Sequence, residues 1–395
     1  MEINRWAAKK GFAMQRYVFR RIVQNLLTFF LFLTMVYVLI DAQPGDFSNI
    51  YVNDPRLTPT QRQVLRDRLG LDRPVLERYF LWLRNFLQGD LGVSFSNYPR
   101  SVLDVILERA PRTLVLFLTA TILSYYIGFM LGKVLAWKRG GPLEYLTTIG
   151  GVSLYTVFLP WFGLMMIWFF SYTLDILPIG KFIDPILWRQ APVEANFVFN
   201  RLLVTGLILS FLGGLWLLLT RRFNPSYQAA ARWLGLGVLL SGALAYWLST
   251  GVSRYALDIL KHLVLPILTL SLVNFAGAML LMRNSMLETL KEDYIMAARA
   301  KGLHPNQVRD RHAARNALLP LVTSFVLALA FVLDGGVITE TIFSWPGMGL
   351  TLLDAAVKED IPMVIGGLVF TGALALSGHL LADVLYAVLD PRIRY

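Results

Sequence analysis

The chain has no cysteine among its 395 residues, which excludes a disulfide framework and thiolate chemistry. Histidine is also scarce, and none of the four histidines belongs to an HExxH pair or to another close metal-ligand spacing. We therefore expect no metal site. Charged residues make up only 16% of the chain, well below the share of about a quarter that is typical of soluble domains.

The net charge of +11 does not indicate a nucleic-acid partner. A nucleic-acid-binding protein gathers its lysines and arginines on one face or along one helix. Here the basic residues are scattered among apolar runs. We therefore expect no nucleic acid among the partners.

Apolar residues are what the chain has in excess, at 56% hydrophobic with a mean hydropathy of +0.54. Such a composition suits a lipid bilayer, which is crossed by about 17 to 25 predominantly apolar residues in a helix. Eight windows of this kind occur, near 22–40, 113–137, 150–173, 201–219, 233–249, 263–282, 318–340 and 363–389. The sequence thus predicts an all-α polytopic membrane protein of about eight transmembrane helices.

The distribution of lysine and arginine over the short loops predicts the orientation. If every window spans, the basic loops all fall on one side, which is then cytoplasmic together with both termini. This makes 1–21 a cytoplasmic N-terminal segment, 22–40 the first transmembrane helix and 41–112 an extracytoplasmic segment. That last segment is rich in arginine, but it is longer than about 60 residues and so lies outside the range of the rule. Apolar stripes at helical spacing predict that it is helical.

Between the sixth and seventh windows the chain reads DYIMAARAKGLHPNQVRDRHAARNALLP. Gly302 is expected to end one short helix, and Pro305 suits the first turn of the next. Ala297 and Ala298 are small enough to let a partner approach the backbone closely. The alternative is a basic loop that only sets the topology.

The detailed pattern of this stretch resembles the cytoplasmic coupling loop of ABC-importer permeases, in the form found in the dipeptide and oligopeptide branch. Two departures are Met296, in place of a glutamate that this branch often lacks, and His304, in place of a serine cap. The resemblance implies that 288–317 receives the movement of separate ATPase subunits. It assigns the coupling to Asp293, Tyr294, Ala297, Ala298, Arg299, Lys301, Gly302, Leu303, His312, Arg315, Asn316 and Pro320.

Further stretches are similar to the same family, namely PGD at 44–46, LGLDRPVLERYFLWLRNFLQGDLGVSF at 69–95, ETIFSWPGMG at 340–349 and DPRIR at 390–394. The resemblance implies a type I permease core of six helices, namely the first transmembrane helix and five helices of the permease domain at 113–395. The two additional windows fall in 181–257, which we interpret as an inserted helical hairpin. A re-entrant or surface-lying pair is the alternative.

A nucleotide site is not expected in this chain, because GFMLGK at 128–133 has its glycines one residue too close for a phosphate-binding loop, and Val134 follows the lysine. The resemblance implies that ATP and magnesium are bound by two partner ATPase subunits or domains. It also implies a sister permease in a pseudo-twofold pair and an extracytoplasmic solute-binding protein. The expected location is a bacterial or archaeal plasma membrane.

Charged residues inside spans are candidates for function. Asp334 followed by Gly335 and Gly336, together with Glu340, is the candidate translocation path or gate. The alternative for Asp334 is an internal hydrogen bond or an ion pair with Lys133. In the last span we expect Asp383, His379 and Tyr386 to make helix-to-helix bonds. The aromatic residues of the third span are interpreted as lipid-facing anchors, with a substrate-stacking lining as the alternative: Trp161, Phe162, Trp168, Phe169 and Phe170.

The sequence therefore predicts a transport subunit, not an enzyme, in an ATP-driven importer of di- or oligopeptides that works by alternating access. Importers of the same family for nickel chelates or oligosaccharides are alternatives. An ion-coupled secondary transporter is another, although no internal repeat is found. An intramembrane enzyme would need a catalytic constellation that the spans do not supply.

Overall fold

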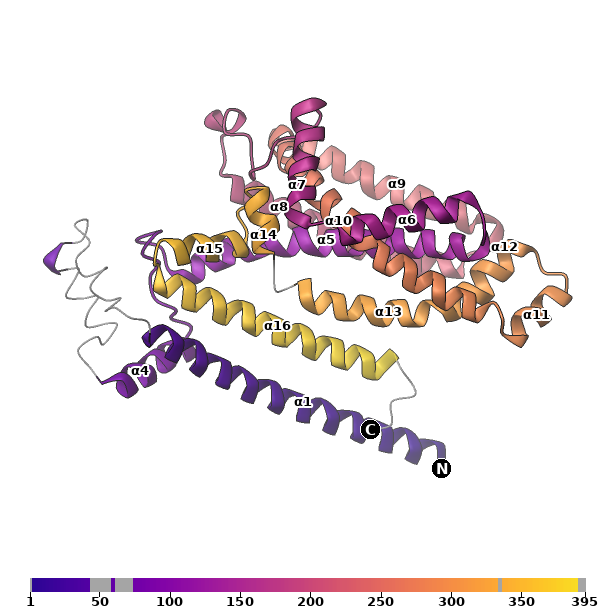
Figure 1. Cartoon of the computed structure of the whole chain (residues 1–395), viewed down its shortest axis with the longest axis horizontal. Helices are drawn as coiled ribbons and strands as arrows, with labels where there is room; N and C mark the ends of the chain where they lie inside the picture. Colours follow the sequence, from indigo (N-terminus) through magenta and orange to yellow (C-terminus); the bar gives the residue numbers. More distant parts are fainter. Residues whose placement is uncertain (1, 43–57, 61–73, 333–335, 390–395) are drawn as a thin grey trace. The chain divides into compact units, whose positions relative to one another are not determined.

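A computed structural model describes residues 2–42, 58–60, 74–332 and 336–389. Among them the regular structure is helical, apart from one isolated bridge between Val93 and Ser101 (Figure 1). The α-helices are α1 (Glu2–Asp41), α4 (Val75–Leu87), α5 (Val102–Trp137), α6 (Pro142–Thr156), α7 (Leu159–Ile167), α8 (Ala195–Leu219), α9 (Pro225–Ser249), α10 (Ser253–Thr289), α11 (Asp293–Ala300), α12 (Pro305–Gln307), α13 (Ala314–Phe331), α14 (Val337–Ile342), α15 (Met348–Val357) and α16 (Ile361–Leu389). The predicted all-α fold is confirmed.

Seven helices of the described residues are long and apolar enough to cross a membrane. They contain Val18–Leu39, Val102–Trp137, Ala195–Arg222, Tyr227–Ser249, Ser253–Thr289, Pro305–Leu329 and Ile361–Val384. An eighth is reached if Pro142–Thr156 and Leu159–Thr173 are counted as one bent span. The predicted number of about eight is therefore met.

The third predicted span, 150–173, is wrong as a straight helix. α6 ends at Thr156, and Val157 takes an extended conformation before α7 starts at Leu159. Pro160 explains the break, because a proline ring collides with the carbonyl four residues earlier, here that of Thr156. Beyond α7 the chain continues as a π-helix over Trp168–Thr173.

α5 begins eleven residues before the predicted start at 113, so the segment predicted as extracytoplasmic ends inside a helix. Ser101 caps this helix, since its hydroxyl accepts a hydrogen bond from the backbone N–H of Asp104 at 3.0 Å and donates one to the Asp104 carboxylate at 2.6 Å. The apolar window alone could not predict this start, because Glu108, Arg109 and Arg112 interrupt it.

The chain divides into two compact units, of which the first comprises Met1–Trp161, Thr269–Thr341 and Pro346–Tyr395. Within it α16 packs against α1, α5, α13 and α15, and α1 lies beside α16 in Figure 1. Arg21 of α1 forms an ion pair with Asp383 of α16 at 3.3 Å. The expected helix-to-helix bond of Asp383 is thus confirmed. The His379 ring bonds the Ala375 carbonyl of its own helix, and the side chain of Tyr386 lies outside the described residues.

Gly128 and Gly132 bring α5 into close contact with α10. A Cβ at Gly128 would lie 2.8 Å from the backbone nitrogen of Met279, and one at Gly132 would lie 2.8 Å from the Met282 Cβ. Spacing of small residues by four places them on one helix face, which lets two backbones approach. The glycines of GFMLGK therefore serve helix packing.

The second unit comprises Phe162–Leu268 and Ile342–Trp345. It holds α8 and α9, the two arms of the predicted insertion, joined by a short 3₁₀ turn over Thr220–Arg222. The arms are hydrogen-bonded by Trp216, whose indole donates to the Ala231 carbonyl at 3.0 Å, and by Arg201, which donates to the Tyr246 hydroxyl at 2.6 Å.

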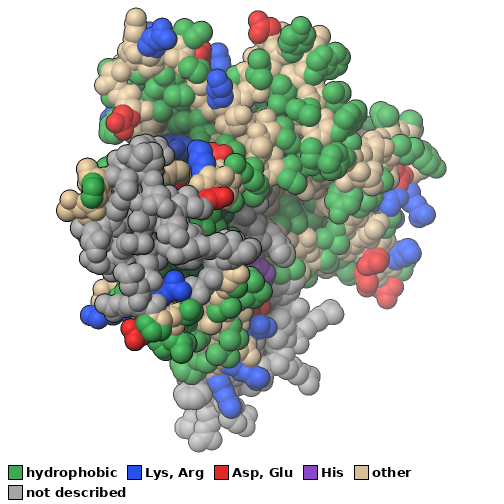
Figure 2. All heavy atoms as spheres, turned by 60° about the vertical axis from the view of Figure 1, so that its left-hand side comes forward, with side chains coloured by type: hydrophobic (Ala, Val, Ile, Leu, Met, Phe, Trp, Pro, Cys, Tyr) green, Lys and Arg blue, Asp and Glu red, His purple; other side chains and the backbone are tan. Residues whose placement is uncertain are grey.

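Large hydrophobic side chains are exposed along both arms and along α7, and Figure 2 shows many such side chains on one face of the molecule. Trp161, Trp168 and Phe169 are each about half exposed. Such exposure is expected of surfaces that face lipid, where apolar side chains are solvated by the acyl chains. It agrees with the interpretation of these aromatic residues as anchors.

We predict that Gly132→Ala lowers the stability of the folded chain by about 1–3 kcal/mol, as overpacking of a tight contact does. The added methyl group would force α5 and α10 apart. The measurement is the thermal unfolding midpoint of the purified chain in detergent. Gly150→Ala is the matched control, because a Cβ at that helical glycine meets no atom within 4 Å. Equal midpoints for the two variants would contradict the packing role.

Candidate functional site

The segment between α10 and α13 forms two short helical pieces joined at a turn, as predicted. α11 is followed by a turn at Lys301 and Gly302, then by α12, which continues through a π-helix, η4 (Val308–Ala313), into α13. Most of these residues are exposed, although the helices on both sides are long and apolar. We call residues 288–317 the 288–317 loop.

Gly302 ends α11 in the left-handed conformation, with a φ of 73°. Its N–H donates to the Arg299 carbonyl at 2.9 Å, and the N–H of Leu303 donates to the Ala298 carbonyl at 3.4 Å. These two bonds form a Schellman motif, in which glycine avoids the strain that a Cβ would bring. The predicted end of the helix at Gly302 is confirmed.

The second piece starts at His304, which does act as an N-cap. Its ring nitrogen Nδ1 accepts from the N–H of Asn306 at 3.3 Å, a long bond that fits a weak cap. Pro305 stands at the first helical position, where its missing N–H costs nothing. The helix then passes through Pro320 without a break.

One side of the 288–317 loop is buried against the ends of the long helices. Ile295, Ala298 and Val308 are almost fully buried there. They belong to one apolar cluster with Ala136 of α5, Met282 and Met286 of α10, and Ala313, Ala314, Ala317 and Leu321. The loop is thus packed onto three helices, and a force on it must be transmitted to them.

The predicted pair of small residues is split by this packing. Ala298 is 6% exposed and belongs to the buried cluster, whereas Ala297 lies on the open side. Only Ala297 can therefore let a partner approach the backbone of α11. The helical spacing of the pair, one residue apart, already places the two side chains about 100° from each other.

Most of the residues assigned by resemblance are exposed. The exposed ones are Asp293, Tyr294, Ala297, Arg299, Lys301, Gly302, Arg315 and Asn316. The Asn316 amide donates to the Tyr294 hydroxyl at 2.8 Å and so ties α11 to α13. Leu303 and His312 are half-buried, and Pro320 is exposed further along α13.

Two residues that sequence reasoning missed, Asp310 and Trp137, join this loop to the end of α5. Lys133 lies 3.1 Å from the Asp310 carboxylate, which is also held by Arg309 at 2.8 Å. The guanidinium of Arg299 lies over the ring of Trp137, 5.6 Å from its centroid. A lone lysine in an apolar window indicated that Lys133 needs an acidic partner. The sequence did not indicate which aspartate or glutamate that partner is.

The candidate path residues are only partly described. Asp334 and Gly335 lie outside the described residues, and Lys133 pairs with Asp310. Gly336 stands where a Cβ would collide with the Phe117 ring. Glu340 is fully buried and accepts hydrogen bonds from the Thr113 hydroxyl at 2.7 Å and from the N–H of Leu350 at 2.9 Å.

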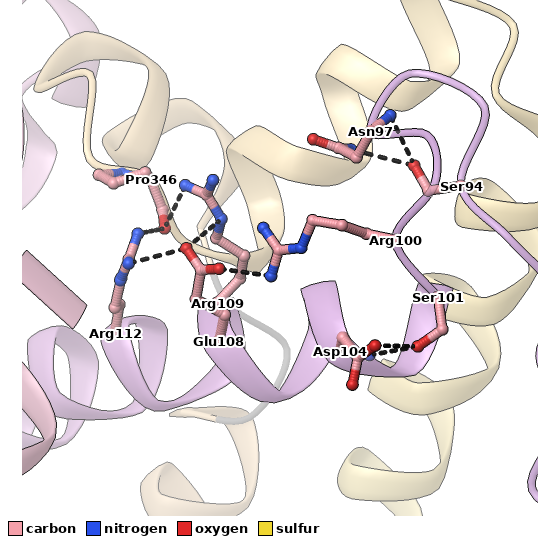
Figure 3. A network of polar contacts seen from close by, with 9 residues as sticks. All are labelled: Ser94, Asn97, Arg100, Ser101, Asp104, Glu108, Arg109, Arg112 and Pro346. Atoms are coloured by element: carbon pink, nitrogen blue, oxygen red, sulfur yellow. Dashed lines mark hydrogen bonds and ion pairs between the residues drawn. The ribbon is translucent and has the colours of Figure 1, made fainter. Parts of the chain in front are cut away.

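The start of α5 and the turn before it carry a cluster of arginines around the Glu108 carboxylate (Figure 3). Glu108 accepts from Arg112 at 2.9 Å and from Arg100 at 2.6 Å. Arg109 and Arg112 each reach the carbonyl oxygen of Pro346 at 3.5 Å. The start of α5 is therefore fastened to the segment 340–350 by several polar contacts.

No group of three or more His, Asp or Glu side chains that could hold a metal ion occurs in the described part of the chain. An exposed loop is packed on three helices, and one of these helices is fastened at its other end to a second loop.

Two family models match the sequence. Residues 124–395 match the model of the binding-protein-dependent transport system inner membrane component, and residues 14–117 match its N-terminal companion. The chain is 31% identical to the di/tripeptide transport system permease protein of Pseudomonas aeruginosa, over 97% of this chain and 99% of that protein. It is 30% identical to the oligopeptide permease protein of Bacillus subtilis, over 97% and 100%, and to the dipeptide permease protein of Escherichia coli, over 97% and 99%.

We predict that Gly302→Val opens the turn of the 288–317 loop, because a β-branched residue in the left-handed conformation costs on the order of 1–3 kcal/mol. Hydrogen exchange of the peptide that contains Leu303 measures this, with faster exchange expected. Gly302→Asn should exchange nearly as the parent does, since asparagine tolerates this conformation. A Cβ at Gly302 meets no atom within 4 Å, so only the backbone is tested. Equal exchange in the two variants would refute the assignment.

Proposed function

Because the chain belongs to the family of binding-protein-dependent transport system inner membrane components, we propose that it carries peptides across a bacterial inner membrane as the permease subunit of an ATP-driven importer. The observation that carries this proposal is the similarity to peptide permeases of three bacteria over nearly the whole of each chain. Di- and oligopeptides are the solutes that those proteins are named for.

The energy source is proposed to lie in two separate ATPase subunits. Gly128 and Gly132, which gave GFMLGK its likeness to a phosphate-binding loop, are occupied in packing α5 on α10. ATP and magnesium are then held by the partners. A sister permease and an extracytoplasmic solute-binding protein complete the proposed assembly, as the membership of the family implies.

The 288–317 loop is the proposed contact with an ATPase subunit. Its open side presents Ala297, Arg299 and Lys301, which offer a close approach to the backbone and positive charge for an acidic rim. Its buried side rests on α5, α10 and α13. In this proposal both termini and the loop are cytoplasmic, and the segment before α5 is outside.

Alternating access then follows from movement of the loop. Protein interiors are close-packed and resist compression, so Ile295, Ala298 and Val308 transmit a displacement of the loop to the helices beneath it. ATP binding and release by the partners would shift the spans between two arrangements, and the solute passes when the outward-facing arrangement gives way to the inward-facing one.

The direct test is uptake by proteoliposomes that contain the complex copurified with this chain and are supplied with a solute-binding protein. We expect accumulation of a labelled di- or oligopeptide that requires ATP on the side of the ATPase subunits. Displacement of the peptide by a nickel chelate or an oligosaccharide would identify a different solute. Uptake by this chain alone, driven by a proton or sodium gradient, would contradict the proposal.

We also predict that Ala297→Gln lowers binding-protein-stimulated ATP hydrolysis at least several-fold without unfolding the chain. Glutamine keeps the helix propensity high, and its longer side chain obstructs the approach of the partner. Ala356→Gln is the control, since Ala356 is an exposed alanine of α15, which precedes the last span and so lies outside in the proposed topology with a cytoplasmic C-terminus. Unimpaired stimulation in Ala297→Gln would remove the loop from the ATPase contact.

A further inference from the structure

α5 is long enough to connect two distant sites within the first unit. It is one continuous helix from Val102 to Trp137. Twenty residues separate Thr113 from Lys133, which at 1.5 Å per residue corresponds to about 30 Å, the thickness of a hydrocarbon core. Contacts made at these two residues are therefore separated along the helix by about the thickness of a hydrocarbon core.

At the Lys133 end, both halves of the 288–317 loop hold the same short piece of α5. Arg299, in α11, covers the ring of Trp137, and Asp310, in η4, pairs with Lys133. Ala136 lies between them in the buried apolar cluster. Three neighbouring positions of one helix end are thus in contact with the loop.

The Lys133–Asp310 pair is the polar part of this junction. The side chain of Lys133 is 14% exposed and that of Asp310 is 40% exposed. Ionisable side chains of membrane spans pair with one another, and the bridge holds the Lys133 ammonium against the 288–317 loop. Arg309 holds the same carboxylate with two bonds, of 2.9 Å and 2.8 Å, which orients Asp310 toward α5.

At the Thr113 end, α5 is fastened to the segment 340–350. The Thr113 hydroxyl donates to Glu340 and accepts from the N–H of Met348, both at 2.7 Å. Arg112, the residue before Thr113, and Arg109, about one turn earlier, both reach the Pro346 carbonyl, as Figure 3 shows. Gly347 and Gly349 leave no room for side chains beside Glu340. This junction is therefore tight.

We propose that α5 transmits movement of the 288–317 loop to the segment 340–350, and that Lys133 and Asp310 are positioning residues that couple the loop to this helix. The inference rests on the proposed function, in which the loop receives the work of the ATPase subunits. When the loop moves, the bridge and the cluster around Ala136 draw the inner end of α5 with it. Since a helix is stiff along its axis, Thr113 then displaces Glu340 and Met348 at the outer face.

The first test measures solute transported per ATP hydrolysed in the reconstituted complex. We expect Lys133→Gln and Asp310→Asn each to lower this ratio about five- to tenfold while the complex still assembles and hydrolyses ATP. Lys133→Arg and Asp310→Glu keep the charges and should restore most of it. The double variant should be no worse than the worse single one, because one interaction is lost in all three. Lys138→Gln is the control, since Lys138 is exposed at the same helix end.

Unchanged transport per ATP in both single variants would overturn the inference. So would a double variant in which the two decreases in transport per ATP add, or a Lys138→Gln variant with an equal decrease. A lower ratio with normal assembly distinguishes positioning from a structural role. A structural role alone would lower the yield of complex and leave the ratio of the surviving complex unchanged.

A second test requires no solute, so it decides the inference even if the peptide assignment fails. The chain has no cysteine, and Leu353 of α15 is 38% exposed. A single cysteine there can be labelled with a membrane-impermeant maleimide, with and without ATP and vanadate. We expect trapping of the ATPase subunits to change the labelling rate in the parent but not in Lys133→Gln. An equal change in both would overturn the role of the pair.

Discussion

The absence of water from the hydrocarbon core is the constraint on which this structure depends. Every backbone N–H and C=O within a span must be bonded inside the protein, which selects helices. Every charge there must find a partner, as Arg21 finds Asp383 and Lys133 finds Asp310. The few polar contacts of the spans therefore mark where helices are joined, and these junctions determine which helices move together.

α5 shows how such junctions combine with packing. Gly128 and Gly132, in its second half, bring α5 onto the backbone of α10. An apolar cluster around Ala136 holds the end of α5 against the 288–317 loop, and nearer the start of the helix Thr113 bonds Glu340. Dispersion contacts in the apolar cluster hold the loop against the helices, and polar contacts fix its orientation relative to α5. The exposed side of the loop is accessible to a partner, whereas its buried side is packed against helices of this chain.

Periodicity and composition predicted the helices, the approximate number of spans and the helix end at Gly302, because these depend on local chemistry. Family resemblance predicted the membership that the comparisons show. The break before Pro160 was missed since the apolar window continues across it, and the start of α5 at Val102 was missed since charges interrupt the window.

The partner of Lys133 could not be predicted, because residues 133 and 310 meet only through tertiary packing. The burial of Ala298 beside the exposed Ala297 was missed because the two were treated as a unit. The assignment of Asp334, Gly335, Gly336 and Glu340 to the translocation path stays a prediction.

The central claim is that this chain is driven by separate ATPase subunits through the 288–317 loop. Photo-crosslinking from a single cysteine introduced at Ala297, in the complex assembled in native membranes, tests it most directly, because the chain has no other cysteine. The account predicts one dominant crosslinked product that contains an ATPase subunit. Crosslinks confined to lipid or to the solute-binding protein, in a complex that still hydrolyses ATP, would contradict it.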